Sequence, residues 1–136
     1  MKPVLLEFCG INSFSEPARI DFTRLLEFGI FGIFGDTGSG KSTILDCIGF
    51  ALYGNVARSR SGSIADIIHY AADRAYVHFV FEIVFEGRRT QYRVERELRR
   101  KNAAQTLKVY EKKGDAFIVV SEGVRDGNAF LERVIG

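Results

Sequence analysis

Apolar and polar residues alternate along the second half of the chain. In residues 75–85, one face collects Val77, Phe79, Phe81, Ile83 and Phe85, and the other includes Tyr76, His78 and Glu82. Residues 91–98 repeat the pattern with Tyr92, Val94 and Leu98 against Gln91, Arg93, Glu95 and Glu97. This period of two predicts half-buried strands, joined by a turn at Gly87, Arg88 and Arg89. Residues 106–110 and 117–120 predict a further hairpin around residues 112–115, so we expect an antiparallel meander.

The first half of the chain has a different pattern. Residues 4–9 and 18–22 predict two strands with a turn at residues 10–14 between them. Residues 29–34 are continuously apolar, which is typical of a strand buried on both faces of a parallel sheet. Residues 43–53 predict a buried helix with Gly54 as its cap, and Ser63 opens a short helix over residues 63–69. Residues 55–62 predict a loop, and residues 122–135 predict a closing helix with Phe130, Leu131 and Val134 facing inward.

Composition limits the class of protein but does not name it. The chain has 136 residues, 26% of them charged, and a net charge of +2. Such a chain can form one domain with a core, and its charge alone does not indicate a nucleic-acid binder. The apolar runs are too short to cross a bilayer and no signal peptide is evident, so we expect a cytoplasmic protein without membrane contact. Cys9 and Cys47 lie in different predicted elements, and we expect both to be reduced.

The strongest motif lies between the apolar run and the first helix. Residues 35–42 read Gly-Asp-Thr-Gly-Ser-Gly-Lys-Ser, which matches the phosphate-binding loop pattern G-x-x-x-x-G-K-[ST]. Strand, loop and helix follow in the order that this motif requires. The alternative is a glycine-rich turn that caps a helix and leaves Lys41 in solvent. The motif predicts nucleotide binding and does not identify the reaction that follows.

Each residue of this loop has a physical role in holding a triphosphate. Gly35, Gly38 and Gly40 permit positive φ angles, so backbone N–H groups can approach phosphate oxygens closely. The predicted catalytic residue is Lys41, whose ammonium neutralises the β- and γ-phosphates, and the predicted metal ligand is Ser42, whose hydroxyl binds Mg²⁺. Thr43 reaches the α-phosphate from inside the helix. The nucleotide-binding residues predicted from the loop and helix start are Asp36, Thr37, Gly38, Ser39, Gly40, Lys41, Ser42 and Thr43.

Several expected parts of a nucleotide hydrolase are not in this sequence. No apolar strand ends in the Asp that usually completes the Mg²⁺ site, and Phe79-Val80-Phe81-Glu82 fits a meander strand better. The Leu-Ser-Gly-Gly signature is absent, as is the Asn-Lys-x-Asp motif of GTPases. We therefore expect residues 1–136 to be a single partial domain, with the missing acid supplied by further sequence or by another polypeptide.

Taken together, these residues resemble the beginning of an SbcC-type ATPase, the bacterial group of SMC-like proteins for double-strand-break repair. Ile20-Asp21-Phe22, the loop with Leu45-Asp46, and Ala51-Leu52-Tyr53-Gly54 carry the resemblance. It implies an α/β fold of the P-loop NTPase type, the N-terminal lobe of an ABC-type ATPase head, with a mixed sheet and an antiparallel meander around the phosphate-loop unit. It also implies that a coiled coil and a C-terminal lobe with the acidic and signature motifs follow.

The resemblance further implies cofactors, partners and site residues. The expected cofactors are ATP and Mg²⁺; the expected partners are double-stranded DNA ends, an SbcD-type nuclease and a second head that dimerises on ATP binding. Asn12 and Ser13 correspond to positions that contact the nucleotide, although family members often carry a basic residue in place of Asn12. His69, between Ile68 and Tyr70, corresponds to a loop that closes over the nucleotide; the alternative is a helix-end histidine that is solvated or bonded to backbone.

Two questions remain open at this level. One alternative function is the nucleotide-binding subunit of a transporter, for which Phe14 is the only candidate to stack on adenine; another is a switch module that binds ATP without hydrolysing it. Basic residues lie at predicted turns, namely Arg58, Arg60, Arg88, Arg89, Arg99, Arg100, Lys101, Lys112 and Lys113. They predict a phosphate-contacting strip for DNA if the turns share an edge, and otherwise solvated charges.

Overall fold

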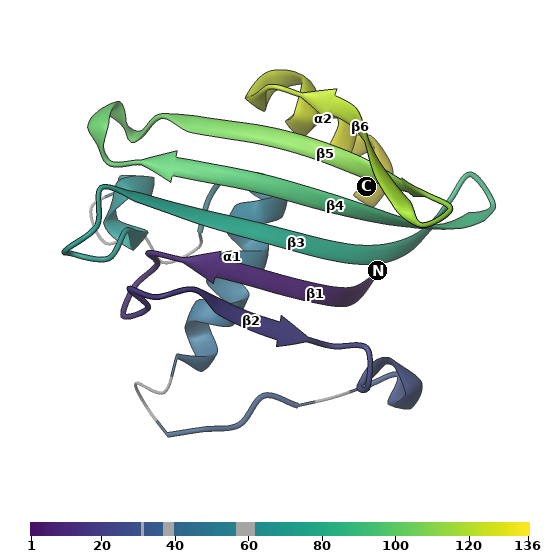
Figure 1. Cartoon of the computed structure of the whole chain (residues 1–136), viewed down its shortest axis with the longest axis horizontal. Coiled ribbons are helices and arrows are strands. Elements are labelled where there is room, and N and C mark those ends of the chain that lie inside the picture. Colours follow the sequence, from purple (N-terminus) through teal and green to yellow (C-terminus); the bar gives the residue numbers. More distant parts are fainter. Residues whose placement is uncertain (31, 37–39, 57–61) are drawn as a thin grey trace.

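Six strands form one antiparallel sheet in the order β2-β1-β3-β4-β5-β6 (Figure 1). The structure, a computed structural model, describes residues 1–30, 32–36, 40–56 and 62–136. The strands are β1 (Lys2–Cys9), β2 (Ala18–Asp21), β3 (Arg74–Phe85), β4 (Arg88–Arg99), β5 (Gln105–Lys113) and β6 (Ala116–Glu122). The helices are α1 (Lys41–Tyr53) and α2 (Val124–Ile135), with short 3₁₀ turns η1 (Leu26–Phe28), η2 (Ile64–Ile67) and η3 (Lys101–Ala103).

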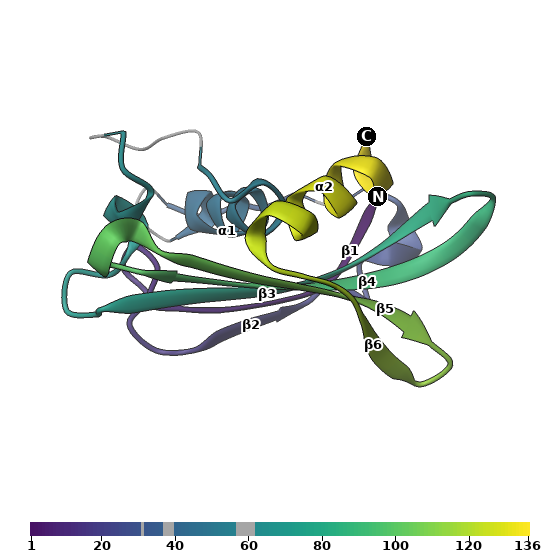
Figure 2. The ribbon, with the colours of Figure 1, turned by 90° about the horizontal axis from the view of Figure 1, so that it is seen from above.

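Both α-helices lie on the same face of the sheet, and the other face is uncovered by helices (Figure 2). The alternating residues predicted from the sequence point to the helices: Val77, Phe79, Phe81, Tyr92, Val94 and Leu98 are all buried. They pack with Cys47, Phe50 and Ala51 of α1 and with Leu131 and Val134 of α2. The meander, both hairpins and both helices of the sequence analysis are therefore confirmed.

Local backbone chemistry explains where these elements end. Gly54 has a φ angle of 70° at the C-terminus of α1, and its N–H donates to the carbonyl oxygen of Phe50 at 2.8 Å. Glu86 and Gly87 both have positive φ angles and form a two-residue hairpin between β3 and β4. This turn lies one residue earlier than predicted, so Arg88 and Arg89 belong to β4. The predicted short helix after Ser63 is the 3₁₀ turn η2, with the Ser63 side chain accepting a bond from the Ala65 N–H.

The predicted strand over residues 29–34 is wrong for the described residues of that segment. Residues 29, 30 and 32–34 form no strand, and Ile30 and Phe34 are 87% and 93% exposed. A strand buried on both faces needs a neighbouring strand on each side and cover above and below. Among the described residues all strand pairs are antiparallel and none includes this segment, so the expected parallel core is also absent there.

Candidate nucleotide-binding site

The N-terminus of α1 begins inside the phosphate-loop motif. Gly40 precedes the helix with φ 92° and ψ 6°, and no side chain caps it. The first turn of α1 contains no acidic residue, so no carboxylate of that turn offsets the partial positive charge that an N-terminus carries. The backbone N–H of Thr43 donates to the Gly40 carbonyl oxygen at 3.1 Å. This arrangement suits an anion.

The rest of the loop is described only in part. Asp36 is exposed, and the Lys41 Nζ donates to the carbonyl oxygen of Gly35. An ammonium has three donors, so this bond leaves Lys41 able to bind phosphate oxygens. Thr37, Gly38 and Ser39, which were predicted to bind the nucleotide, lie outside the described residues.

The turn between β1 and β2 contacts the start of α1. The Asn12 Nδ2 donates to the Oγ1 of Thr43 at 3.0 Å, across 31 positions of sequence. Thr43 is only 6% exposed, and its hydroxyl can still donate a hydrogen bond while it accepts this one. Ser13, the next residue of the turn, is exposed. Asn12 and Thr43, which the sequence placed in separate segments, therefore lie together.

A third segment, residues 67–69, completes this group. The Asn12 N–H donates to the Ile67 carbonyl oxygen at 2.7 Å, and the His69 N–H donates to the Gly10 carbonyl oxygen at 2.8 Å. Ile11 and Ile68 form an isolated antiparallel bridge between the two bonds. His69 is thereby held beside the turn that contacts α1.

The imidazole of His69 is 9% exposed and bonded to backbone. Its Nδ1 accepts a hydrogen bond from the Ala71 N–H at 3.1 Å, which places the proton of the neutral ring on Nε2. The ring of Tyr70, which is largely exposed, lies 4.4 Å away between centroids. The backbone-bonded alternative for His69 is therefore what the structure shows, and its role toward a nucleotide stays a prediction.

Ser42 supplies one hydroxyl at the mouth of a groove. This groove has a volume of about 590 Å³ and runs along the exposed side of α1, past Leu45, Gly49 and Tyr53. Within the part of the chain that the structure describes, no group of three or more His, Cys, Asp or Glu side chains could hold a metal. Mg²⁺ keeps most of its shell as water and phosphate oxygen, so a single protein hydroxyl fits its chemistry.

Phe14, the residue needed by the transporter alternative, packs inside the fold. Its ring meets Phe8 edge to face at 5.0 Å between centroids. A Cβ on Gly40 would lie 2.7 Å from two carbons of the same ring. Gly40 is thus required both for its positive φ angle and for the approach of Phe14, and the ring supports the start of α1 from below.

Two arginines of β4 and its following turn have roles that the sequence analysis missed. Arg96 is 1% exposed and donates to the Ala51 carbonyl oxygen near the C-terminus of α1 at 3.0 Å. Its position two residues after Val94 and two before Leu98 could have placed it on the helix-covered face. Arg100 donates to carbonyl oxygens of His69 and Ala72, a contact that no local sequence pattern signals.

The basic turns do not share one edge of the sheet. In the antiparallel meander, Arg88 and Arg89 lie at the same end as Lys112 and Lys113, whereas residues 99–101 lie at the opposite end (Figure 1). Arg89, Arg99 and Lys113 are also within 4 Å of carboxylates. A single strip containing all the turns is therefore wrong; Arg58 and Arg60 lie outside the described residues.

Two further expectations concern cysteine chemistry and membranes. Cys9 and Cys47 are both free, as expected, and burial raises the pKa of the Cys47 thiol well above its ordinary value. The helices in the described ranges include none with the length and apolarity needed to cross a bilayer.

Comparisons with known proteins agree with the motif. A model of the AAA domain family matches residues 6–129. A subunit of the SbcCD nuclease from Clostridium acetobutylicum is 39% identical over 142 residues, which cover 100% of this chain and 12% of that protein. The SbcCD nuclease subunit of the same name from Bacillus subtilis is 36% identical, with 100% and 12% covered. A probable DNA double-strand break repair Rad50 ATPase from Aquifex aeolicus is 38% identical, with 82% and 11% covered. The chain thus spans about an eighth of the length of these relatives.

Proposed function

This chain belongs to the AAA domain family, and we propose that it is the ATP-binding lobe of an SbcC-like ATPase in a DNA-repair nuclease complex. The observation that carries the proposal is the N-terminus of α1. There an uncapped helix start, the Lys41 ammonium and the Ser42 hydroxyl follow a complete phosphate-loop motif. The names of the aligned relatives support the same reading.

In this proposal each described residue has a defined task. N–H groups at the start of α1 bind phosphate oxygens, and Lys41 neutralises charge on the β- and γ-phosphates. Ser42 binds Mg²⁺, which supplies further neutralisation of the phosphates when it is bound. Asn12 orients Thr43 toward the α-phosphate through the bond between their side chains. Ser13 and His69 line the same side of the nucleotide.

The remaining parts of the machine come from elsewhere in this proposal. Residues 1–136 form one lobe of an ABC-type head, and a further lobe or a second head supplies the acidic group and the signature motif. Two heads dimerise around ATP in the cytoplasm, and an SbcD-type nuclease acts with them on double-stranded DNA ends. The transporter alternative is not favoured, because Phe14 packs against Phe8 and Gly40 and the relatives carry repair names.

The test is Lys41→Ala in the complete protein, with Lys101→Ala as a control that removes an equal charge from an exposed turn. We expect Lys41→Ala to lower ATP affinity by at least about a hundredfold, because it removes charge-assisted bonds to two phosphates. The control should bind ATP as the unmodified protein does. Fluorescence of a labelled ATP analogue measures both, and phosphate release with DNA present tests hydrolysis. Unchanged ATP affinity in Lys41→Ala would overturn the proposal; ATP binding without phosphate release would favour the switch module.

A further inference from the structure

Arg100 holds the loop that carries His69. Its Nη2 donates to the carbonyl oxygens of His69 and Ala72, each at 3.0 Å, and its Nε donates to Ala72 at 3.2 Å. The backbone N–H of Arg100 also donates to the Asp73 carbonyl oxygen at 2.8 Å. Four bonds from one residue therefore fasten residues 69–73 to the end of β4.

That loop is in turn bonded to the turn that contacts α1. His69 binds Gly10, Ile67 binds Asn12, and the Asn12 side chain binds Thr43 in the first turn of the helix. Every step in this route is a hydrogen bond between 2.7 and 3.0 Å. The route joins Arg100, which is far from the phosphate loop in sequence, to the proposed nucleotide site.

The neighbours of Arg100 do not take part in this route. Arg99 lies on the opposite face of β4, where its Nε is 3.4 Å from a carboxylate oxygen of Glu97. Lys101 is exposed at the start of η3. Three adjacent residues thus carry the same charge, and one of them is bonded to the His69 loop.

We propose that Arg100 is a positioning residue for nucleotide binding, acting through the His69 loop and Asn12 on the first turn of α1. A guanidinium suits this task, because its planar fork can bond two carbonyl oxygens at once and loses little freedom in doing so. An ammonium presents a single nitrogen on a flexible stem and cannot reproduce that geometry. This inference rests on the proposed function and adds a residue to it that no phosphate-loop motif contains.

The experiment compares Arg100→Ala, Arg100→Lys, Arg99→Ala and Lys101→Ala in the complete protein without DNA. Affinity for a fluorescent ATP analogue is measured beside the melting temperature. We expect Arg100→Ala to weaken binding about tenfold, and Arg100→Lys to weaken it by about threefold or more, through loss of the charge-assisted bonds. Arg99→Ala and Lys101→Ala should stay within about twofold of the unmodified protein, because their contacts lie off the route.

Several results would overturn the proposal. Equal losses in all three alanine variants would mean that charge matters and not position. A lower melting temperature with unchanged affinity in Arg100→Ala would mean a structural role only. Should Arg100→Ala fail to fold, wild-type affinity in Arg100→Lys would overturn it equally.

Asn12→Ala tests the route itself. When Asn12 has been removed, Arg100→Ala should change affinity by less than about twofold, since both act on Thr43 through one path. A second full tenfold loss in the double variant would contradict that path. Lys41→Ala separates the two proposals: if it retains ATP binding the proposed function fails, whereas if it alone loses binding only the role of Arg100 fails.

Discussion

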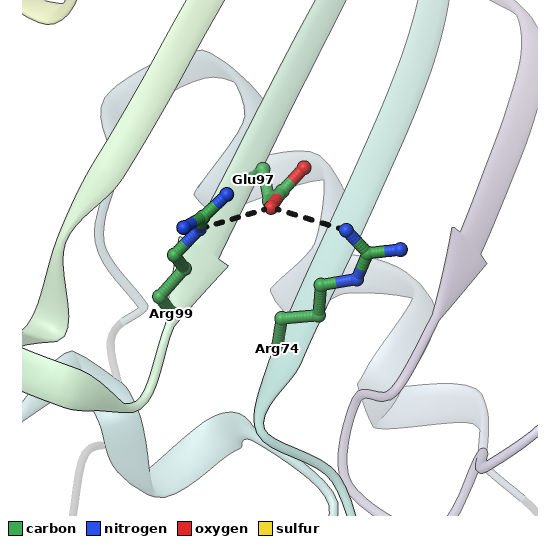
Figure 3. A network of polar contacts seen from close by, with 3 residues as sticks. All are labelled: Arg74, Glu97 and Arg99. Carbon is green, nitrogen blue, oxygen red and sulfur yellow. Dashed lines mark hydrogen bonds and ion pairs between the residues drawn. The ribbon is translucent and has the colours of Figure 1, made fainter.

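Strand β4 presents arginines to both faces of the sheet, and the two faces supply different partners. On the helix-covered face, Arg96 donates to Ala51, to the Gln105 Oε1 at 3.1 Å and to the Asn128 Oδ1 at 2.7 Å. None of these three acceptors is a carboxylate. On the open face, Arg93 lies 2.7 Å from a Glu95 oxygen, and Glu97 lies between Arg74 and Arg99 (Figure 3).

The difference follows from the surroundings of each guanidinium. Arg96 is buried against the C-terminal turn of α1, where carbonyl dipoles carry partial negative charge, and its guanidinium lies 5.9 Å from the Phe50 ring centroid. Burial lowers the pKa of Arg96 to about 10. The open-face pairs are reached by solvent, where ion pairs contribute little. Arg96 therefore links α1, β4, β5 and α2, whereas the open-face arginines hold only their neighbours.

The largest expected effect comes from Arg96→Met, which keeps the apolar stem and removes every donor. Ala51, Gln105 and Asn128 would each lose a hydrogen bond inside the fold. We expect the free energy of unfolding to fall by about 2–4 kcal/mol. Urea unfolding followed by circular dichroism measures the change. Arg99→Met on the open face is the control, and equal losses at both positions would show that the two faces do not differ.

A smaller effect concerns His78 on the open face. Burial is the main cause of its lowered pKa and outweighs the opposing influence of Glu95, Glu7 and Glu97, while Arg93 also lowers it. The unfolded state, with an ordinary pKa of 6.5, then binds more protons than the folded state between the two pKa values. Stability from His78 is thus complete above that range and is lost as the pH falls through it.

The substitution His78→Gln should remove this pH dependence. Comparing urea midpoints at about pH 7.5 and about pH 5.5, we expect the unmodified protein to lose more stability on acidification than the variant does. His69 remains in both proteins, so its titration cancels in the difference. Equal losses in the two proteins would contradict a lowered pKa at His78.

The smallest effect is expected at Glu97, which is 3.7 Å from Arg74 and 3.4 Å from Arg99 (Figure 3). Both arginine side chains are more than half exposed. Glu97→Gln should change the free energy of unfolding by less than about 0.5 kcal/mol, and added salt should reduce the difference further. The same urea experiment measures it. A loss approaching that of Arg96→Met would mean that the open face is as tightly coupled as the covered one.

Most of the sheet could be predicted because its signal is local. A period of two selects one face for burial wherever it occurs, as in Val77, Phe79 and Phe81, whatever the partner strand is. The same rule places Arg96 on the buried face, and its charge obscured that signal. Residues 29–34 show the limit of such patterns, since continuous apolar character states a need for burial and not where the neighbouring strands come from.

The candidate site divides in the same way. Gly40, Lys41 and Ser42 are recognised from their spacing, because a helix N-terminus can bind phosphate without help from distant residues. The bonds that join Asn12 to Thr43 and Arg100 to His69 span 31 residues each. No periodic pattern encodes such a pairing.

The sequence by itself determined which segments are strands and helices, which face of each is apolar, and where a phosphate can bind. Those properties depend on residues within a few positions of one another, so the chain carries them before it folds. Only the tertiary structure decided that Arg96 is neutralised by the end of α1 and that Arg100 reaches the loop beside the proposed nucleotide site. Those partners become neighbours when the strands pair, and their geometry depends on register and on the packing of α1 over the sheet.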